Sequence, residues 1–274
     1  MKRTHPARRA ALAIAMTAGL GLVTVVRAQQ EAAPPNLLYV LNPDKPDALK
    51  ISGSTLAAAN ARVYVLSNHK RAINIGSEGK VTVRGMLAVG GTEMASTAKT
   101  TIKERLGSIE VRDPMAGIAT PVFTGLTNLG TARVSGDQLE SQLLPGLYDK
   151  VEAGLKAQVK LNSGVYAIKE LTLHTGAVVT GANVMLYVGK LRMDSKAKLT
   201  ISAPAHGDYK DLAVFVSRRT TDPAQINTEA QLEVTGTVYV ANAPLILSSN
   251  AKLTCSHLVV NTLDVANGAT LTLR

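Results

Sequence analysis

The densest group of side chains that could do chemistry lies in one short segment of the second half of the chain. It consists of His206, Asp208, Asp211, Arg218 and Arg219. A carboxylate pair beside a histidine and two cations, placed near a groove, could bind calcium and abstract a proton. The same residues also fit a solvated bend between two strands, whose side chains satisfy turn backbone. We favour the bend, because the other acidic residues are scattered along the chain.

The remaining histidines and glycines add no second candidate. His69, His174 and His257 stand singly, without the spacing that metal ligands need. GGTEMAS at 90–96 begins with two glycines but leads into an irregular segment rather than a helix that could hold phosphate, and no serine stands in a nucleophile elbow. The sequence therefore predicts no catalytic residue, no metal site and no cofactor.

Any site would be positioned by short strands, which recur in the sequence as repeats. LILSSNAKLTC (245–255) and LDVANGATLTL (263–273) match position by position at an offset of 18. Alternation of apolar and polar residues over four to six positions is typical of a strand with one buried face. We therefore predict that six aliphatic residues point into one core, namely Leu245, Leu247, Leu253, Leu263, Val265 and Leu271.

Two further repeats support a stack of such units. Residues 48–65 match 72–89 at an offset of 24, and LLPGLY (143–148) matches LNSGVY (161–166) at an offset of 18. Repetition near 20 residues is typical of stacked supersecondary units. The sequence predicts an all-β fold, a parallel β-helix or β-solenoid with rungs of about 18–24 residues. A β-sandwich with hairpins is the alternative, but it predicts more varied strands.

Composition agrees with a thin, layered core. Hydrophobic residues make up 46% of the chain, yet aromatic residues make up only 3% and tryptophan is absent. A narrow core filled by rows of Val, Leu, Ile and Ala has little room for rings. The single cysteine, Cys255, aligns with Leu273 in the 18-residue repeat. We expect it to be a buried apolar residue, and an intermolecular disulfide is the alternative.

Three segments are expected along the chain. Residues 1–28 combine a basic start, an apolar run and small residues before Gln29, which predicts a signal peptide cleaved between Ala28 and Gln29. A retained membrane anchor is the alternative. Residues 29–36 are expected to be a linker. Residues 37–274 are expected to form a single β-solenoid domain, with an irregular excursion at 92–142 that runs over the outside of the stack.

The charge balance argues against nucleic acid as a partner. The chain has 30 basic and 20 acidic residues, and removal of residues 1–28 with their five Lys and Arg residues reduces the net charge from +10 to +5. HKR at 69–71 and SRR at 217–219 have no interleaved aromatic residues, so they are expected to be solvated corners. A membrane is expected to be contacted only through an uncleaved leader.

Several phrases, in this order, resemble a family of exported bacterial proteins. They are SGSTLAAAN, DPMAGIATP, PGLY with SGVY, HGDYKDLAVF and GTVYVANAPLILSS, within residues 37–265. The chain is similar in these phrases to proteins labelled as Tad-type (Flp) pilus-assembly proteins of the TadG kind. The resemblance implies association with the cell surface or a pilus, and it implies a structural bend at Tyr209. This chain departs from the family in having one cysteine instead of paired cysteines.

Three classes of function follow from these observations. The first is an exported, non-enzymatic structural or adhesive surface protein located in the periplasm, on the cell surface or outside the cell. The second is a secreted polysaccharide-active enzyme of the β-helix type, which rests on fold analogy alone. The third is a carbohydrate-binding module that uses outward threonine rows. The threonines expected to face outward are Thr172, Thr200, Thr254, Thr270 and Thr272.

The end of the chain suggests a partner. The last alternating strand runs to Leu273, and only Arg274 follows. A terminal rung offers unpaired backbone groups and an apolar layer unless something covers it. We expect either that residues 92–142 fold over this rung or that it self-associates or binds another surface or pilus protein.

Overall fold

The computed structural model describes residues 36–104, 106, 112–118, 121, 123–136 and 140–274. The predicted signal peptide, its cleavage between Ala28 and Gln29, and the predicted linker up to residue 35 lie outside the described residues. Pro35–Arg274 form one compact unit. Within the described residues, no helix is long and apolar enough to cross a membrane.

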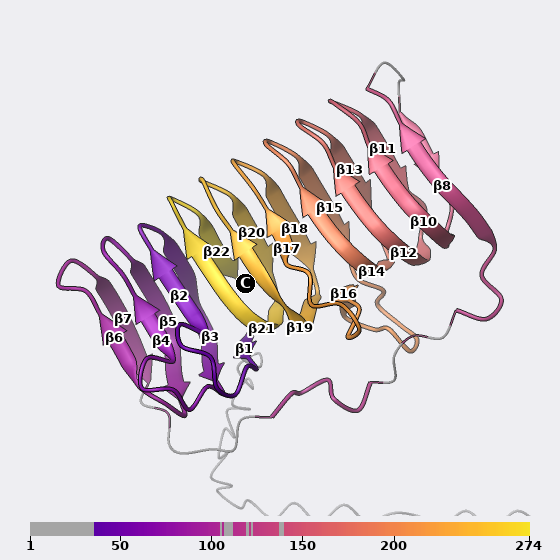
Figure 1. Cartoon of the computed structure of the whole chain (residues 1–274). Helices are drawn as coiled ribbons and strands as arrows, with labels where there is room; N and C mark the ends of the chain where they lie inside the picture. The colour runs from indigo at the N-terminus through magenta and orange to yellow at the C-terminus, as the bar shows by residue number, and fades with distance from the viewer. Residues whose placement is uncertain (1–35, 105, 107–111, 119–120, 122, 137–139) are drawn as a thin grey trace, which may run out of the picture. The chain divides into compact units, whose positions relative to one another are not determined.

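The described residues form an all-β structure without helices, built from parallel strands (Figure 1). The strands are β1 (Leu37–Val40), β2 (Leu49–Ser52), β3 (Thr55–Val65), β4 (Ile73–Ile75), β5 (Lys80–Ala88), β6 (Thr92–Met94), β7 (Lys99–Glu104), β8 (Asn128–Val134), β9 (Ser141–Leu143), β10 (Gly146–Ala153), β11 (Gln158–Leu161), β12 (Gly164–Leu173), β13 (Val178–Gly181), β14 (Val184–Met193), β15 (Lys198–Ser202), β16 (Leu212–Val216), β17 (Ala224–Ile226), β18 (Gln231–Thr235), β19 (Thr237–Leu247), β20 (Lys252–Cys255), β21 (His257–Ala266) and β22 (Thr270–Leu273).

The strands wind around one core and present three faces. In one turn, β12 follows the first face with residues 164–168 and the second face with 170–173, β13 follows the third face, and β14 returns to the first. Successive rungs pair in register, as Leu171 does with Leu191. The stack has about 11 turns. The predicted β-solenoid is therefore confirmed, and the β-sandwich alternative is wrong because sequential strands are stacked in parallel rather than paired as hairpins.

The inward positions form the aliphatic core that the repeats predict. The six core residues predicted from the 18-residue repeat are each no more than 1% exposed. Leu245 pairs with Leu263, and Leu253 pairs with Leu271, so that offset is confirmed. Cys255 is fully buried and pairs with Leu273, as expected.

The other two predicted repeats hold only in part. Leu49 pairs with Ile73 at the predicted offset of 24, but the register changes along β3, where a bulge interrupts the pairing with β5. Leu143 pairs with Leu161 at the predicted offset of 18, whereas Gly146 pairs with Tyr166 at an offset of 20. The corner between the third and first faces is two residues longer in the later rung, which shifts the register after it.

A repeated turn joins the second face to the third. Its third residue has positive φ, as in Gly176 (71°), Lys196 (58°) and Asn250 (63°), a conformation that β-turns of type II and I′ require. Ala177 then donates its N–H to the carbonyl of His174 at 2.9 Å, and alanine follows the turn in most rungs. These alanines are fully buried inside the corner. This turn accounts for a pattern that recurs in the sequence, in which small or polar residues are followed by alanine.

The order of the rungs in space differs from their order in sequence. β21 lies between β19 on one side and β1 and β2 on the other, and β22 lies between β20 and β3 (Figure 1). Thr55 donates its N–H to the carbonyl of Ala269 at 3.0 Å across this junction. The expectation that residues 92–142 cover the C-terminal rung is therefore wrong. Residues 37–65 cover it, because their strands have the same alternation and supply the missing backbone partners.

The excursion is also shorter than predicted. Residues 92–104 and 128–143, which the sequence placed largely outside the stack, contribute β6 and β7 at one end of the stack and β8 and β9 at the other. The alternation in these strands is weak because they are outer rungs with more exposed side chains. Of the residues expected in the excursion, the described ones between 112 and 127 lie outside the strands of the stack and form what we call the strap.

We predict that the two faces of one strand tolerate charge very differently. Val179 is 3% exposed and points into the core, whereas its neighbour Thr180 is exposed and lies beside Lys160. Val179→Asp should lower the free energy of unfolding by about 4 kcal/mol, because it buries an unpaired carboxylate. Thr180→Asp should change it by less than about 0.5 kcal/mol. Urea unfolding of both variants checks this, and equal destabilisation would contradict the strand's orientation.

Candidate functional site

The structure does not gather the predicted polar cluster into one site. His206, Asp208 and Asp211 are exposed on the loop between β15 and β16, and Arg219 is exposed just after β16. Arg218 is half-buried and turns toward the strap. Among the described residues, no hydrogen bond or ion pair joins the histidine or either aspartate to the two arginines. The bend expected from the sequence therefore coincides with an ordinary surface loop.

Arg218 fastens the strap to the stack. Its guanidinium donates to the backbone carbonyls of Met115 and Ile118, both at 2.7 Å, and to the hydroxyl of Tyr239 at 2.8 Å. That hydroxyl in turn donates to Asp113 at 2.8 Å. Burial raises the pKa of Tyr239 to about 12, so the phenol keeps its proton for this bond. Arg218 is therefore a structural anchor for the strap.

The strap lies on a row of outward aromatic residues of the first face. Tyr239, Phe215 and Tyr187 are register neighbours, with ring centroids 4.7 Å and 5.6 Å apart, and the strap's Phe123 packs on Tyr187 at 4.8 Å. Met115 packs against the same cluster. Four of the nine aromatic residues of the chain are thus gathered at the strap, whereas Tyr148 and Tyr166 belong to the solenoid core.

A shallow groove of about 420 Å³ opens where the strap reaches Phe123. Leu147, Ala167 and Tyr187 form part of its wall, and Arg219 stands at the same groove. The ion pair between Lys169 and Asp149, 2.6 Å apart, lies beside it. The groove can accommodate a small apolar group, but no two carboxylates approach each other there as proton abstraction or calcium binding would need.

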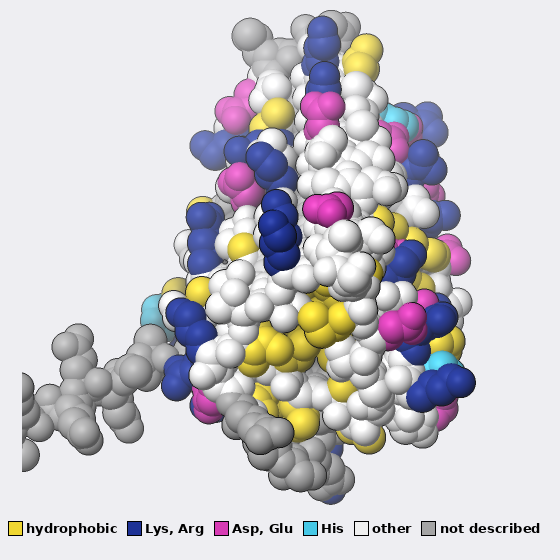
Figure 2. Space-filling model, turned by 90° about the vertical axis from the view of Figure 1, so that its left-hand side faces the viewer, with side chains coloured by type: hydrophobic (Ala, Val, Ile, Leu, Met, Phe, Trp, Pro, Cys, Tyr) yellow, Lys and Arg dark blue, Asp and Glu magenta, His cyan; other side chains and the backbone are white. Residues whose placement is uncertain are grey.

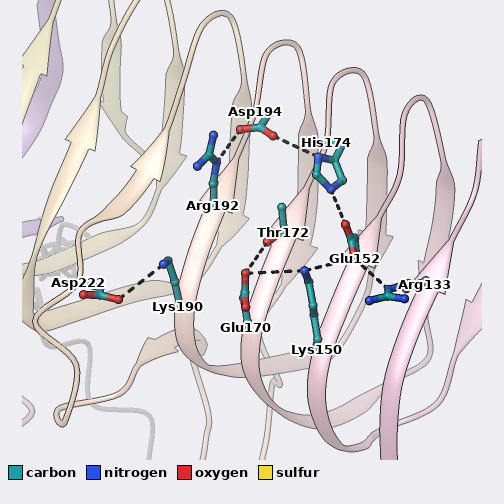
Figure 3. A network of polar contacts seen from close by, with 10 residues as sticks. All are labelled: Arg133, Lys150, Glu152, Glu170, Thr172, His174, Lys190, Arg192, Asp194 and Asp222. Atoms are coloured by element: carbon teal, nitrogen blue, oxygen red, sulfur yellow. Dashed lines mark hydrogen bonds and ion pairs between the residues drawn. The ribbon is translucent and has the colours of Figure 1, made fainter.

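A second polar constellation, centred on His174, was missed by the sequence analysis (Figure 3). His174 Nε2 lies 2.8 Å from Glu152 Oε1, and its Nδ1 lies 3.3 Å from Asp194 Oδ2. Arg192 pairs with Asp194 at 2.8 Å, and Lys150 pairs with Glu152 at 3.3 Å. The signal was the spacing of 20 residues between His174 and Asp194, which equals the local rung period and places them side by side.

This constellation links four successive rungs, from Arg133 on β8 to Asp194 after β14. The hydrogen bond from His174, followed by the contacts of Lys150, lowers the pKa of Glu152. Arg133 also pairs with Glu152 at 3.2 Å, so two basic side chains share this carboxylate. In the part of the chain that the structure describes, no group of three or more His, Cys, Asp or Glu side chains could hold a metal ion.

The third face carries the largest regular array of outward polar groups. Two adjacent rows follow the stack. The row that we call the threonine row contains Thr180, Thr200, Glu233, Thr254, Thr272, Ala57, Thr82 and Thr101. The neighbouring row, which we call the lysine row, contains Lys198, Gln231, Lys252, Thr270, Thr55, Lys80 and Lys99.

The two rows contain four of the five threonines that were expected to face outward. Thr200, Thr254 and Thr272 share the threonine row, and Thr270 lies in the lysine row. Thr172 instead lies on the second face and is 6% exposed, because its hydroxyl packs beside Glu170. The structure therefore forms a more regular ladder than the sequence indicated, since the rungs that lengthen the spacing do not disturb the register of this face.

Comparison of the chain with protein-family models, with curated proteins and with solved structures finds no match. The resemblance to Tad-type pilus-assembly proteins therefore stays a prediction.

We predict that Arg218 and Arg219 differ in what they hold. Arg218→Ala should release the strap and lower the free energy of unfolding by about 2 kcal/mol, because two carbonyls and a buried phenol lose a charged donor. Arg219→Ala is the matched control and should have little effect. Limited proteolysis should cut the Arg218→Ala variant faster within the strap. Equal cleavage of the two variants and the parent would contradict the anchor.

We predict that Glu152 contributes stability only above acidic pH. Its folded-state pKa is lowered, so its ionised form is stabilising above the unfolded value of about 4.3, and this contribution is lost as the pH falls below it. The difference in melting temperature between the parent and Glu152→Gln should therefore shrink between pH 7 and pH 3. The same comparison in a His174→Gln background should begin smaller. A difference that persists unchanged at pH 3 would contradict this.

Proposed function

We propose that this chain is an exported, non-enzymatic adhesive or structural surface protein whose third face attaches to an acidic polysaccharide. The observation that carries the proposal is the pairing of the lysine row with the threonine row along the stack. The repeated phrase is Lys-x-Thr, which occurs at 80–82, 99–101, 198–200 and 252–254. The copies at 80–82, 99–101 and 252–254 place an ammonium group and a hydroxyl side by side on one strand, whereas the hydroxyl of Thr200 is buried.

The geometry of the lysine row suits a long, regularly charged chain. Strands of neighbouring rungs lie about 4.8 Å apart, so the row presents its side chains at a constant interval. Lys80, Lys99 and Lys252 are exposed, and among the described residues no carboxylate lies within ion-pair distance of them. Lys198 is the exception, because Glu233 lies 3.5 Å from it. An extended polyanion could engage the free ammonium groups without bending.

The threonine row favours a sugar polymer over other polyanions. Hydroxyl groups can donate and accept hydrogen bonds, which matches the hydroxyl groups of a sugar. The outward positions of both rows hold no aromatic ring on which nucleic-acid bases could stack. They also hold no arginine, which is the preferred residue for phosphate because its planar guanidinium matches phosphate geometry. We therefore favour carboxylates carried on a polysaccharide.

The proposal of a non-enzymatic role rests on how the carboxylates are paired. The acidic residues around His174 are each shared with lysine or arginine, and the groove beside Phe123 holds one ion-paired aspartate. A β-helix lyase needs convergent acids to bind calcium and a base to abstract a proton. The secreted-enzyme hypothesis is kept as the alternative, and it is tested by the same experiment.

The resemblance to TadG-like proteins adds the proposed location. Signal-peptide cleavage at Ala28 would place the solenoid outside the cytoplasm, where acidic polysaccharides and pilus components are found. A stiff stack of rungs with one adhesive face suits either a surface attachment or a pilus-associated assembly.

We predict that the protein binds polygalacturonate and that the third face carries this binding. Neutralising Lys80, Lys99 and Lys252 together to Gln should weaken binding about tenfold, or ~1.4 kcal/mol, and parent binding should weaken as salt rises. Neutralising Lys169, Lys190 and Lys210 to Gln removes the same charge from elsewhere and should change binding little. Isothermal titration with the parent and both triple variants measures this.

The outcomes separate the hypotheses. Equal loss in the two triple variants would mean attraction by net charge alone and would overturn the proposed face. Equal binding to polyphosphate or to anionic lipid vesicles would point to another polyanion. Release of unsaturated or reducing sugar ends from polygalacturonate would replace adhesion with the enzyme alternative.

A further inference from the structure

The two outer rungs of the stack have strands paired on one side. Among the strands that the structure describes, β6 pairs with β4 and β7 with β5, while β8 pairs with β10 and β9 with β11. Strand edges of this kind offer backbone N–H and C=O groups to another chain. Figure 2 looks onto the β6–β7 end, where apolar side chains gather in the lower half within a rim of charged groups.

The core is unfinished at the β6–β7 end. Met94 is the last residue of the inward column that contains Ile75, and Ile102 is the last residue of the column that contains Val83. Met94 is 47% exposed and Ile102 is 45% exposed, whereas Ile75 and Val83 are fully buried. Another rung placed on this end would bury both side chains.

The opposite end of the stack offers matching residues. The column that ends on Met94 begins at Val134, which is 6% exposed, and the column that ends on Ile102 begins at the half-buried Leu143. If the β8–β9 end of a second copy continued the stack in register, Val134 would lie beside Met94 and Leu143 beside Ile102. Apolar residues would then meet apolar residues in both columns.

The charged row of the second face is complementary at its two ends. This row runs from Arg133 through Glu152 to Asn74 and Glu93, one residue for each rung. Both terminal side chains are largely exposed, at 74% for Arg133 and 63% for Glu93. Continuation of the row from one copy into the next would place a carboxylate next to a guanidinium.

The chain already contains one junction of this type. β22 and β3 are far apart in sequence, yet they pair in parallel and in register in the middle of the stack. Leu263 donates its N–H to the carbonyl of Ala48 at 2.8 Å across the same junction. Rungs that are not consecutive in the chain can therefore dock in register.

We infer that the protein assembles head to tail, the β6–β7 rung of one copy pairing in parallel with the β8–β9 rung of the next. The partner is a second copy of this chain. A contact between unlike ends does not close, so it leads to a filament rather than a dimer. This inference is independent of the proposed adhesive face, which lies along the side of the stack.

Charge reversal at the two ends tests the inference. Glu93→Arg alone and Arg133→Glu alone each place like charges at every junction, so both variants should sediment as monomers at concentrations where the parent forms longer species. A 1:1 mixture of the two variants restores opposite charges at every junction of an alternating filament. The weight-average sedimentation coefficient of the mixture should therefore rise to that of the parent.

The contrary outcomes are equally defined. A parent that sediments as a monomer at every concentration overturns the inference, and so does a mixture that stays monomeric while each variant melts like the parent. If either variant is unfolded, Ile102→Glu replaces it, because a side chain that is 45% exposed at an end of the stack can be changed without loss of the fold. That variant should also block assembly.

Cross-linking tests the orientation separately. Thr100 and Ser141 end one core column at opposite ends of the stack. Neighbouring strands are about 4.8 Å apart, within the reach of a disulfide. A mixture of Thr100→Cys and Ser141→Cys proteins should form a disulfide-linked pair, and neither variant should pair with itself. Self-pairing of one variant alone would mean a head-to-head dimer and would overturn the head-to-tail arrangement.

Discussion

Parallel hydrogen bonding between successive rungs, kept in register, is the constraint on which the rest of this structure depends. Because residue stands opposite residue from rung to rung, each position of one turn becomes a row along the stack. Inward rows are mostly aliphatic, and the row inside one corner is mostly alanine. This constraint produces the repeats in the sequence, because a residue type that fits one position of a rung fits the same position in the other rungs.

The same register can bring like charges of neighbouring rungs close together, and the second and third faces limit this repulsion in different ways. Like charges in one row would stand only about 4.8 Å apart and repel. On the second face, residues of opposite sign alternate among themselves and with neutral residues, as around His174, so neighbouring rungs attract (Figure 3). On the third face, Gln231, Thr270 and Thr55 interrupt the lysine row, and only Lys80 and Lys99 are direct neighbours. Both of these lysines are exposed, so water and salt screen their repulsion.

The sequence predicted what local alternation encodes and failed where contacts depend on the path of the chain. The strands, the core residues such as Leu253 and the burial of Cys255 follow from short repeats. The pairing of β1–β3 with β21 and β22 does not, because an aliphatic row has the same appearance whichever rung lies beside it. Arg218 was grouped with His206 by proximity in sequence, whereas its partners are carbonyls of the strap about 100 residues away. His174 was considered alone because the search for metal spacing ignored the rung period.

The strap and the central junction between β22 and β3 together determine which rungs lie at the ends of the stack. The first described strand, β1, lies in the middle of the stack, the strands that follow it build rungs to one end, and the chain must then reach the other end to continue. The stretch between β7 and β8 can span about 80 Å when extended, against roughly 50 Å for the stack, so it has slack to settle on the aromatic row. This path places both ends of the solenoid domain in the interior of the stack, where each covers the other. The rungs left at the outside are internal segments tied together by the strap, and Arg218 fixes that strap at its middle.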